Sequence, residues 1–165
     1  MNFTKKIGQA LIAGSIAIAV NILLLRLADG LGIATAGGGL QRLVKLWIAI
    51  PVTRSGVGEL WASLGLPGPD TTTFKMGFKV TVGLAMALFY ALALEPRLAG
   101  NALAKGLVYA VFAWALNAFI VLPLLGNGIA GWHELTAFGM VCFAVAHTAF
   151  FITLALGYEM LRRRL

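Results

Sequence analysis

The chain has 165 residues, of which 60% are hydrophobic and only 12% are charged, and this balance excludes an ordinary soluble domain. Its net charge of +7 comes from Lys and Arg residues scattered along the chain, which excludes a concentrated nucleic-acid-binding surface. The single cysteine, Cys142, excludes an intrachain disulfide, a CxxC redox pair and a cysteine-based zinc site. We therefore predict a single integral membrane domain that covers residues 1–165.

The first apolar stretch follows Lys5 and Lys6 and predicts a transmembrane helix at about 6–28. Residues 17–19 (Ala-Ile-Ala) fit the small-x-small pattern of a secretory cleavage site. Apolar sequence nevertheless continues through residue 25, which makes the stretch long enough to cross a bilayer. This continuation favours an uncleaved first membrane span.

A long segment follows the first helix and predicts an amphipathic helical segment in the membrane interface at about 40–64. Apolar side chains recur there at helical spacing, while three polar residues are expected to turn away from them: Leu40, Leu43, Val44, Trp47, Ile48 and Pro51 against Gln41, Arg42 and Lys45. A second short apolar pattern comprises Val57, Leu60, Trp61 and Leu64. Such a segment places aromatic and basic residues at the level of the lipid headgroups.

Three further apolar runs predict transmembrane helices at about 75–96, 102–125 and 133–157. Each run is long enough to cross ~30 Å of hydrocarbon as a helix that rises ~1.5 Å per residue. A helix also pairs its own backbone groups, which lipid cannot do. The expected fold is therefore an all-α membrane protein with four transmembrane helices.

Four spans place both termini on the same side of the membrane. Basic residues flank both tails, at Lys5 and Lys6 and at residues 162–164, and they also flank the short loop near Arg97 and Lys105. The loop at 126–132 on the other side has no Lys or Arg. The positive-inside rule therefore predicts a multi-pass protein with both termini in the cytoplasm.

Weak internal similarity predicts two repeated hairpins of the same orientation. Superposing the first helix on the third aligns Asn21 with Asn117, and superposing the second on the fourth aligns Gly77 with Gly139. Small residues also recur at every fourth position, in rows that include Gly77, Gly106 and Gly157. Such rows allow close helix packing, so they predict a compact bundle and a homo-oligomer or a place in a larger membrane complex.

One pattern joins the third and fourth predicted helices and consists of residues 105–109 (Lys-Gly-Leu-Val-Tyr), Trp114, residues 122–128 (Leu-Pro-Leu-Leu-Gly-Asn-Gly), 146–148 (Ala-His-Thr) and 156–158 (Leu-Gly-Tyr). This pattern resembles a group of uncharacterised bacterial inner-membrane proteins typified by YagU. The resemblance implies a four-helix fold in the bacterial inner membrane. It also implies that the turn at 122–128 closes one hairpin and that a histidine lies in the middle of the next helix.

Four polar residues fall inside the predicted spans, namely Asn21, Lys79, Asn117 and His147. Polar groups are costly in lipid, so these residues are the candidates for a ligand site or polar cavity in the outer half of the bundle. Structural roles are the alternatives. Lys79 can extend toward the headgroups, the two Asn side chains can join helices by hydrogen bonds, and His147 can be a packing residue.

The two histidines of the chain suggest one cofactor hypothesis. His133 and His147 are 14 residues apart, which on one helix places them on the same face, about 21 Å apart. This spacing is similar to that of the haem-ligating helices of cytochromes b. Each haem b needs two axial histidines there, so a homodimer would be required. The alternative is that Trp132, His133 and Glu134 form an interfacial helix start.

Motifs for soluble-type catalysis are absent from the sequence, including GxSxG, HExxH and GxxxxGK[ST]. No acidic residue falls in the middle of a predicted span, which argues against proton-coupled export. The leading hypothesis is a small non-enzymatic membrane protein, without cofactor or metal, that contacts lipids and either assembles with itself or serves as an accessory subunit. The alternatives are a haem-binding or lipid-like-ligand-binding protein that uses His147, and a minor permease.

Overall fold

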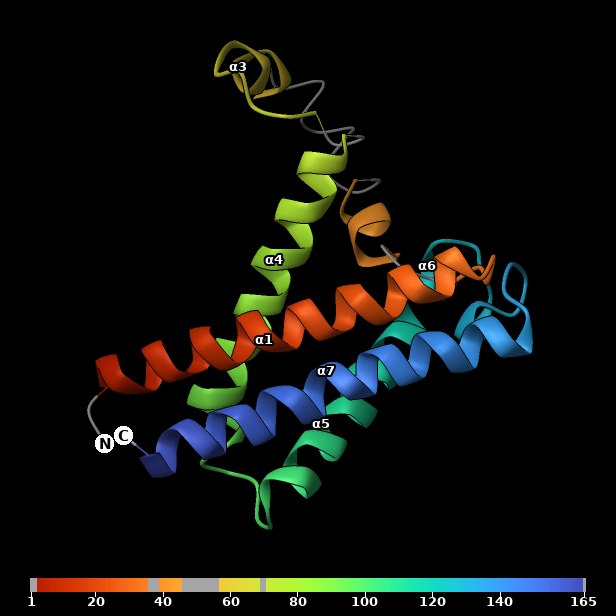
Figure 1. The fold of residues 1–165 in the computed structure, drawn as a ribbon. Helices are drawn as coiled ribbons and strands as arrows, with labels where there is room; N and C mark the ends of the chain where they lie inside the picture. Colours follow the sequence, from red (N-terminus) through yellow and green to blue (C-terminus); the bar gives the residue numbers. More distant parts are fainter. Residues whose placement is uncertain (1–2, 36–38, 46–56, 69–70, 165) are drawn as a thin grey trace.

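The structure is a computed structural model that describes residues 3–35, 39–45, 57–68 and 71–164. Within these ranges the chain is helical and has no strand (Figure 1). The elements in chain order are α1 (Phe3–Gly30), a short helix at 39–45, α3 (Val57–Ser63), α4 (Thr72–Phe89), the π-helix η1 (Tyr90–Leu94), α5 (Ala102–Leu116), the π-helix η2 (Asn117–Val121), α6 (Leu122–Leu124), the 3-10 helix η3 (Ile129–Gly131) and α7 (Ala137–Arg164).

Four of the described helices are long and apolar enough to cross a membrane, which confirms the predicted all-helical membrane fold. They are Phe3–Gly30, Thr72–Leu94, Ala102–Leu124 and Ala137–Arg164. Side-chain caps explain where two of them begin. The Thr71 hydroxyl accepts a hydrogen bond from the Phe74 amide at 3.2 Å, and the Asn101 side chain accepts one from the Ala104 amide at 2.8 Å.

The last helix begins and ends later than the sequence indicates. It was expected at about 133–157, but α7 runs from Ala137 to Arg164. The Thr136 hydroxyl accepts a hydrogen bond from the Gly139 amide at 3.1 Å, so this threonine caps the helix start. At the other end, residues 162–164 are arginines, whose charge is favourable next to the last carbonyl groups of a helix.

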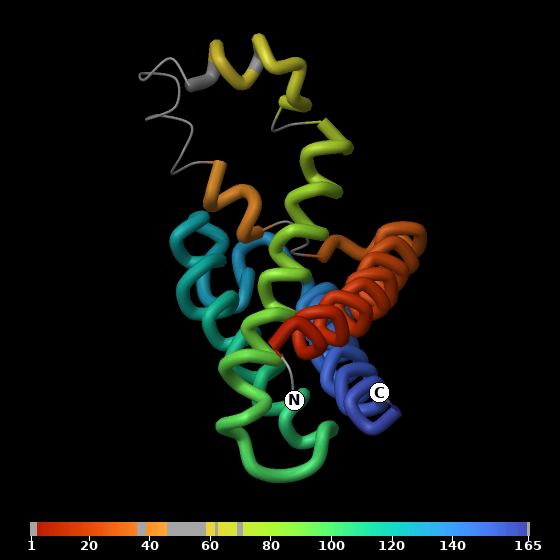
Figure 2. The backbone as a smooth tube through the Cα atoms, turned by 90° about the vertical axis from the view of Figure 1, so that its left-hand side faces the viewer, coloured from red at the N-terminus to blue at the C-terminus, as the bar shows by residue number. Residues whose placement is uncertain are grey.

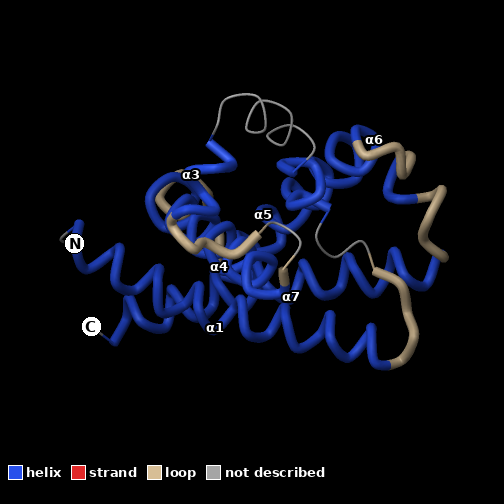
Figure 3. Tube along the Cα trace, turned by 90° about the horizontal axis from the view of Figure 1, so that it is seen from above, coloured by secondary structure: helices blue, strands red, loops and turns tan. Residues whose placement is uncertain are grey.

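Helices α1 and α7 run antiparallel and side by side, so the chain begins and ends at the same end of the bundle (Figures 1 and 3). Two hydrogen bonds tie these helices together. Gln9 Nε2 donates to the Leu161 carbonyl at 3.3 Å, and Asn21 Nδ2 donates to the Ala146 carbonyl at 2.9 Å. Helix α5 packs on the other side of α7, while α4 crosses α1 steeply (Figure 2). The two-hairpin repeat stays a prediction.

Small residues allow the helices to approach closely. A Cβ atom at Gly106 of α5 would lie 3.0 Å from the Phe151 carbonyl oxygen of α7, and one at Gly157 of α7 would lie 3.4 Å from the Ala13 Cβ of α1. Gly77 was expected in the same role, but it is exposed and a Cβ there would have no described atom within 4 Å. Gly77 therefore packs against no helix in the described part of the chain.

The end of the bundle near the chain termini carries a network of ion pairs. Glu95 is buried, and its Oε1 lies 3.3 Å from Lys105 Nζ and 3.2 Å from Arg162 Nη1. Arg162 also pairs with Glu159 at 2.9 Å. Because these residues come from the α4–α5 loop, α5 and α7, the network joins three parts of the chain.

Both π-helical turns precede a proline. In η1 the Glu95 amide bonds the Tyr90 carbonyl, and in η2 the Leu122 amide bonds the Asn117 carbonyl. Pro96 and Pro123 follow directly after these two bonds. A proline lacks an N–H and its ring crowds the carbonyl one turn earlier, so a widened turn relieves the crowding.

Candidate functional site

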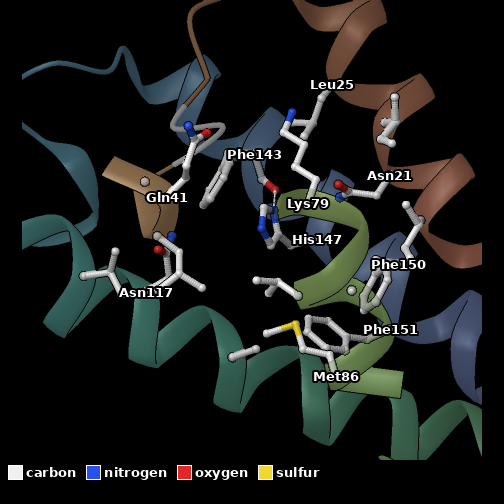
Figure 4. Close-up of a pocket in the computed structure, with 18 of the residues that line it drawn as sticks. Asn21, Leu25, Gln41, Lys79, Met86, Asn117, Phe143, His147, Phe150 and Phe151 are labelled. Atoms are coloured by element: carbon white, nitrogen blue, oxygen red, sulfur yellow. Dashed lines mark hydrogen bonds between the residues drawn. The ribbon is translucent and has the colours of Figure 1, made fainter. Parts of the chain in front are cut away.

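A cavity of about 170 Å³ lies between α1, α4, η2 and α7, and we call it the polar cavity. The four intramembrane polar residues predicted from the sequence, Asn21, Lys79, Asn117 and His147, all line it (Figure 4). Each lies about 10–15 Å along its helix from the end that faces away from the chain termini. The fold thus brings four residues from distant parts of the sequence to one depth of the bundle.

Most of the remaining wall is apolar. The described lining includes aliphatic, aromatic and thioether side chains from all four spans, among them Ile18, Phe78, Val82, Met86, Leu116 and Phe150. A site with apolar walls and a few convergent polar groups is typical of a binding site for a small molecule.

Asn21 forms part of the wall and also fixes its geometry. Its Nδ2 donates a hydrogen bond to the Ala146 carbonyl, which directly precedes His147 in α7. The amide nitrogen is thereby engaged between two helices, while the Oδ1 atom is an acceptor at the cavity wall. Asn21 therefore has the structural role considered from the sequence and also lines the polar cavity.

His147 is held by its own helix. Its Nδ1 lies 3.0 Å from the Phe143 carbonyl, and its ring packs on the Phe143 ring with the centroids 4.1 Å apart. A carbonyl oxygen only accepts, so Nδ1 carries the proton in this contact. In the neutral imidazole, Nε2 is then left with the lone pair as an acceptor.

Asn117 is the least satisfied of the four. Its Nδ2 is buried and has no hydrogen-bond partner among the residues that the structure describes. Asn117 lies at the start of the π-helical turn, and a Cβ atom at Gly39 would be 3.8 Å from its Oδ1. A buried amide donor without a partner costs about 1–3 kcal/mol, so this position favours an occupant that accepts a hydrogen bond.

Lys79 is the one charged residue among the described residues that line the polar cavity. In the view of Figure 4 its side chain lies between Asn21 and His147. Within the described ranges, Lys79 forms no ion pair with a carboxylate. A charge inside a membrane span costs about 2.5–3.5 kcal/mol on insertion scales unless water or a counter-charge solvates it.

The short helix at 39–45 supplies lining residues that the sequence did not predict. Gln41 was expected to turn away from the apolar side, but it is buried and lines the polar cavity together with Gly39 and Leu40. The start of the predicted interfacial segment at 40–64 therefore packs into the bundle. The segment includes residues 46–56, which lie outside the described residues, and its last part contains α3 with Leu60 and Leu64 exposed.

The sequence around Gln41 does not indicate that this residue lines a cavity. A glutamine on the polar side of an amphipathic pattern is explained equally well by exposure to water. Such a glutamine indicates a cavity only when another polar group is known to lie opposite it in the fold. The sequence around the glutamine does not show this, because the opposing group comes from a distant part of the chain.

His133 lies apart from the polar cavity. It was expected on the same helix as His147, but it belongs to the exposed turn before α7, and its Nδ1 lies 3.2 Å from the Gly126 carbonyl. Gly126 and Gly128 adopt positive φ of 79° and 72°, which makes this turn tight and folds His133 back over it. The stacked arrangement of two histidines on one helix face does not occur.

The chain was compared with models of protein families, with curated proteins and with solved structures, and none of the three comparisons found a match.

Proposed function

We propose that this chain is a non-enzymatic multi-pass membrane protein that binds one end of a small lipid-like molecule in the polar cavity. The observation that supports the proposal best is the convergence of Asn21, Lys79, Asn117 and His147 from four helices at one depth. Polar groups in a span are costly and are kept there for a partner, a cavity or a functional role. Here Asn21, Asn117 and His147 line one cavity together with the cationic Lys79 and with apolar side chains.

The volume of the polar cavity limits what it holds. At about 170 Å³ it is close to a cavity of ~150 Å³ that accommodates benzene, and smaller than the roughly 300–1,000 Å³ of drug-sized sites. A head group or a short apolar group fits this space. For the haem alternative, the structure shows only that His133 lies in the turn before α7, so the 14-residue spacing of the two histidines is not a spacing along one helix.

Self-assembly has less support than ligand binding. The small-residue rows suggested it, but Gly106 and Gly157 are used in contacts between helices of the same chain. The row formed by Gly77, Thr81 and Ala85 is instead exposed on α4. Assembly through this row is therefore a second, weaker proposal.

The same proposal includes a cellular location. We place the protein in the bacterial inner membrane with both termini in the cytoplasm. The basic residues at both tails support this orientation, because positively charged segments are retained on the cytoplasmic side.

The proposal is tested by filling the polar cavity. Val82→Trp adds bulk at its wall, whereas Val111→Trp adds the same bulk at an exposed position of α5 and is the matched control. The purified proteins are extracted, and bound amphiphiles are identified and quantified by mass spectrometry. We expect a stoichiometric amphiphile in the wild type and the control and its loss in Val82→Trp.

Equal recovery of amphiphiles from all three proteins would contradict the proposal, since it would show ordinary annular lipid. An absorption spectrum of the same samples tests the haem alternative independently. A Soret band that disappears in His147→Ala would favour haem over a lipid-like ligand.

A further inference from the structure

We propose that the ligand of the polar cavity carries an anionic group, a carboxylate or a phosphate, and that Lys79 and Asn117 bind it. This inference rests on the proposed function and adds the chemical class of the ligand. Two separate observations support it, the charge balance of the lining and the buried amide of Asn117. The ligand is then an anionic amphiphile whose apolar part contacts the remaining wall.

The described residues that line the cavity carry an excess of positive charge. Lys79 contributes a positive charge, and the described residues that line the cavity include no Asp or Glu. Glu95 and Glu159 lie near the chain termini and are engaged by Lys105, Arg162 and Arg163. An anionic ligand supplies the counter-charge that a lysine in a low-dielectric site favours.

Asn117 adds a second hydrogen-bond donor to the cavity, and this donor is an uncharged amide. Its Nδ2 is buried and lacks a partner among the described residues, and its side chain lines the cavity. A lysine ammonium and an amide NH₂ are both donors, and an ionised carboxylate or phosphate offers several acceptor sites. An oxyanion therefore suits each of these donors, which a neutral apolar ligand does not.

Acceptors line the same cavity and limit the position of the anion. When His147 is neutral, its Nε2 carries a lone pair, as does the Oδ1 of Asn21, so neither atom then attracts an oxyanion. The anion is thus expected to be bound by Lys79 and Asn117 rather than by these two acceptors. The acceptors suit a hydroxyl group on the ligand, such as that of a protonated phosphate.

The competing explanation is that Lys79 extends to lipid headgroups outside the cavity. Lys75 provides the matched comparison, because it lies one turn earlier on α4, is exposed and does not line the cavity. If Lys79 contacts only headgroups, its substitution should change ligand binding no more than the substitution of Lys75. If Lys79 binds the ligand, its substitution should weaken binding more than that of Lys75.

The experiment uses the full chain in nanodiscs of zwitterionic phosphatidylcholine and three probes with the same alkyl chain: laurate, lauryl phosphate and lauryl alcohol. Binding is measured by calorimetry for the wild type, Lys79→Gln, Lys75→Gln and Asn117→Leu. We expect at least one anionic probe to bind the wild type about tenfold more tightly than the alcohol. Lys79→Gln removes this difference, Asn117→Leu reduces it and Lys75→Gln preserves it.

The outcomes test the anionic character of the ligand separately from ligand binding itself. Tighter binding of laurate identifies a carboxylate source such as a free fatty acid, and tighter binding of lauryl phosphate identifies a phosphate head. Equal affinity for the alcohol and both anions, or equal losses in Lys79→Gln and Lys75→Gln, overturns the anionic ligand while leaving ligand binding intact. Absence of binding by all three probes overturns the proposed function itself. If Lys79→Gln does not fold, Lys79→Arg is used, and it is expected to keep the preference for the anion.

Discussion

The side-chain Nδ2 of Asn21 donates a hydrogen bond of 2.9 Å to the backbone carbonyl of Ala146. This bond joins the middle of α1 to the middle of α7, at the residue directly before His147. Together with the bond from Gln9 to the Leu161 carbonyl near the chain termini, this polar bond restricts the relative rotation of two helices whose remaining contacts are largely apolar and non-directional. The position of His147 at the polar cavity therefore depends on a residue of another helix.

Asn21→Leu is expected to lower the free energy of unfolding by roughly 0.6–2 kcal/mol, which is the usual size of hydrogen bonds between membrane helices. Ser15→Ala is the control, because the Ser15 hydroxyl bonds only the Leu11 carbonyl of its own helix and is exposed. Unfolding in detergent, followed by circular dichroism, measures both variants. Equal stability of the two variants would mean that the bond between α1 and α7 contributes nothing.

Gly106→Leu is expected to destabilise the bundle by about 1–3 kcal/mol or more, because overpacking forces a close contact apart. A side chain at this position would meet the Phe151 carbonyl and the Ala155 Cβ of α7. Gly77→Leu is the control within the chain, since a Cβ at Gly77 has no described atom within 4 Å. Thermal unfolding of both variants tests the difference, and equally strong losses would refute the packing of α5 on α7.

Gly77→Leu also tests assembly through α4. If copies of the chain meet along Gly77, Thr81 and Ala85, native mass measurements of the variant will give a smaller particle than those of the wild type. A wild-type protein that is monomeric in mild detergent and in nanodiscs would remove the assembly proposal.

Glu95→Gln is expected to lower the free energy of unfolding by about 1–3 kcal/mol, since Glu95 is buried between Lys105 and Arg162 and accepts charge-assisted bonds. Glu159→Gln removes two pairs within one helix, whose arginine side chains are exposed, and should cost only about 0.3–0.5 kcal/mol per pair. Denaturation of both variants at low and high salt distinguishes them. The prediction is wrong if the Glu95 variant is as stable as the Glu159 variant.

Reporter fusions at the two ends of the chain are expected to report the same compartment, because the start of α1 and the end of α7 lie together (Figure 1). The cytoplasmic side is expected, given the basic residues at 162–164 and at Lys5 and Lys6. Reporters on opposite sides of the membrane would contradict the four-span fold.

The spans were predictable because each carries its signal locally. An apolar run of sufficient length forms a helix in lipid whatever its neighbours are, so all four spans were found from composition and length alone. The convergence of Asn21, Lys79, Asn117 and His147 was also expected, since polar residues in spans tend to face the interior of a bundle.

The differences between sequence and structure arise where the outcome depends on distant parts of the chain. Gln41 is buried and lines the same cavity as Asn117 of η2 and Lys79 of α4, which no local pattern indicates. His133 lies in a turn because Thr136 caps α7, whereas Trp132 and Glu134 on either side of it fitted an interfacial helix start with an acid in the first turn. Gly77 matched a packing pattern, but the pattern does not indicate whether a partner helix is present.

Pro123 influences the polar cavity without touching it. Asn117 and Leu122 are five residues apart, and a Cβ at Gly39 would lie 3.8 Å from Asn117 Oδ1 and 3.6 Å from Leu122 Cδ2. On a regular α-helix two such residues point about 140° apart, so only the widened turn before the proline brings them to the same neighbour. Pro123→Ala restores an N–H and removes the ring, which permits the regular turn and rotates Leu122 away from Gly39. The shape of the cavity is thus encoded partly by a residue outside its wall, and a change there is expected to reshape the cavity while every lining side chain is unchanged.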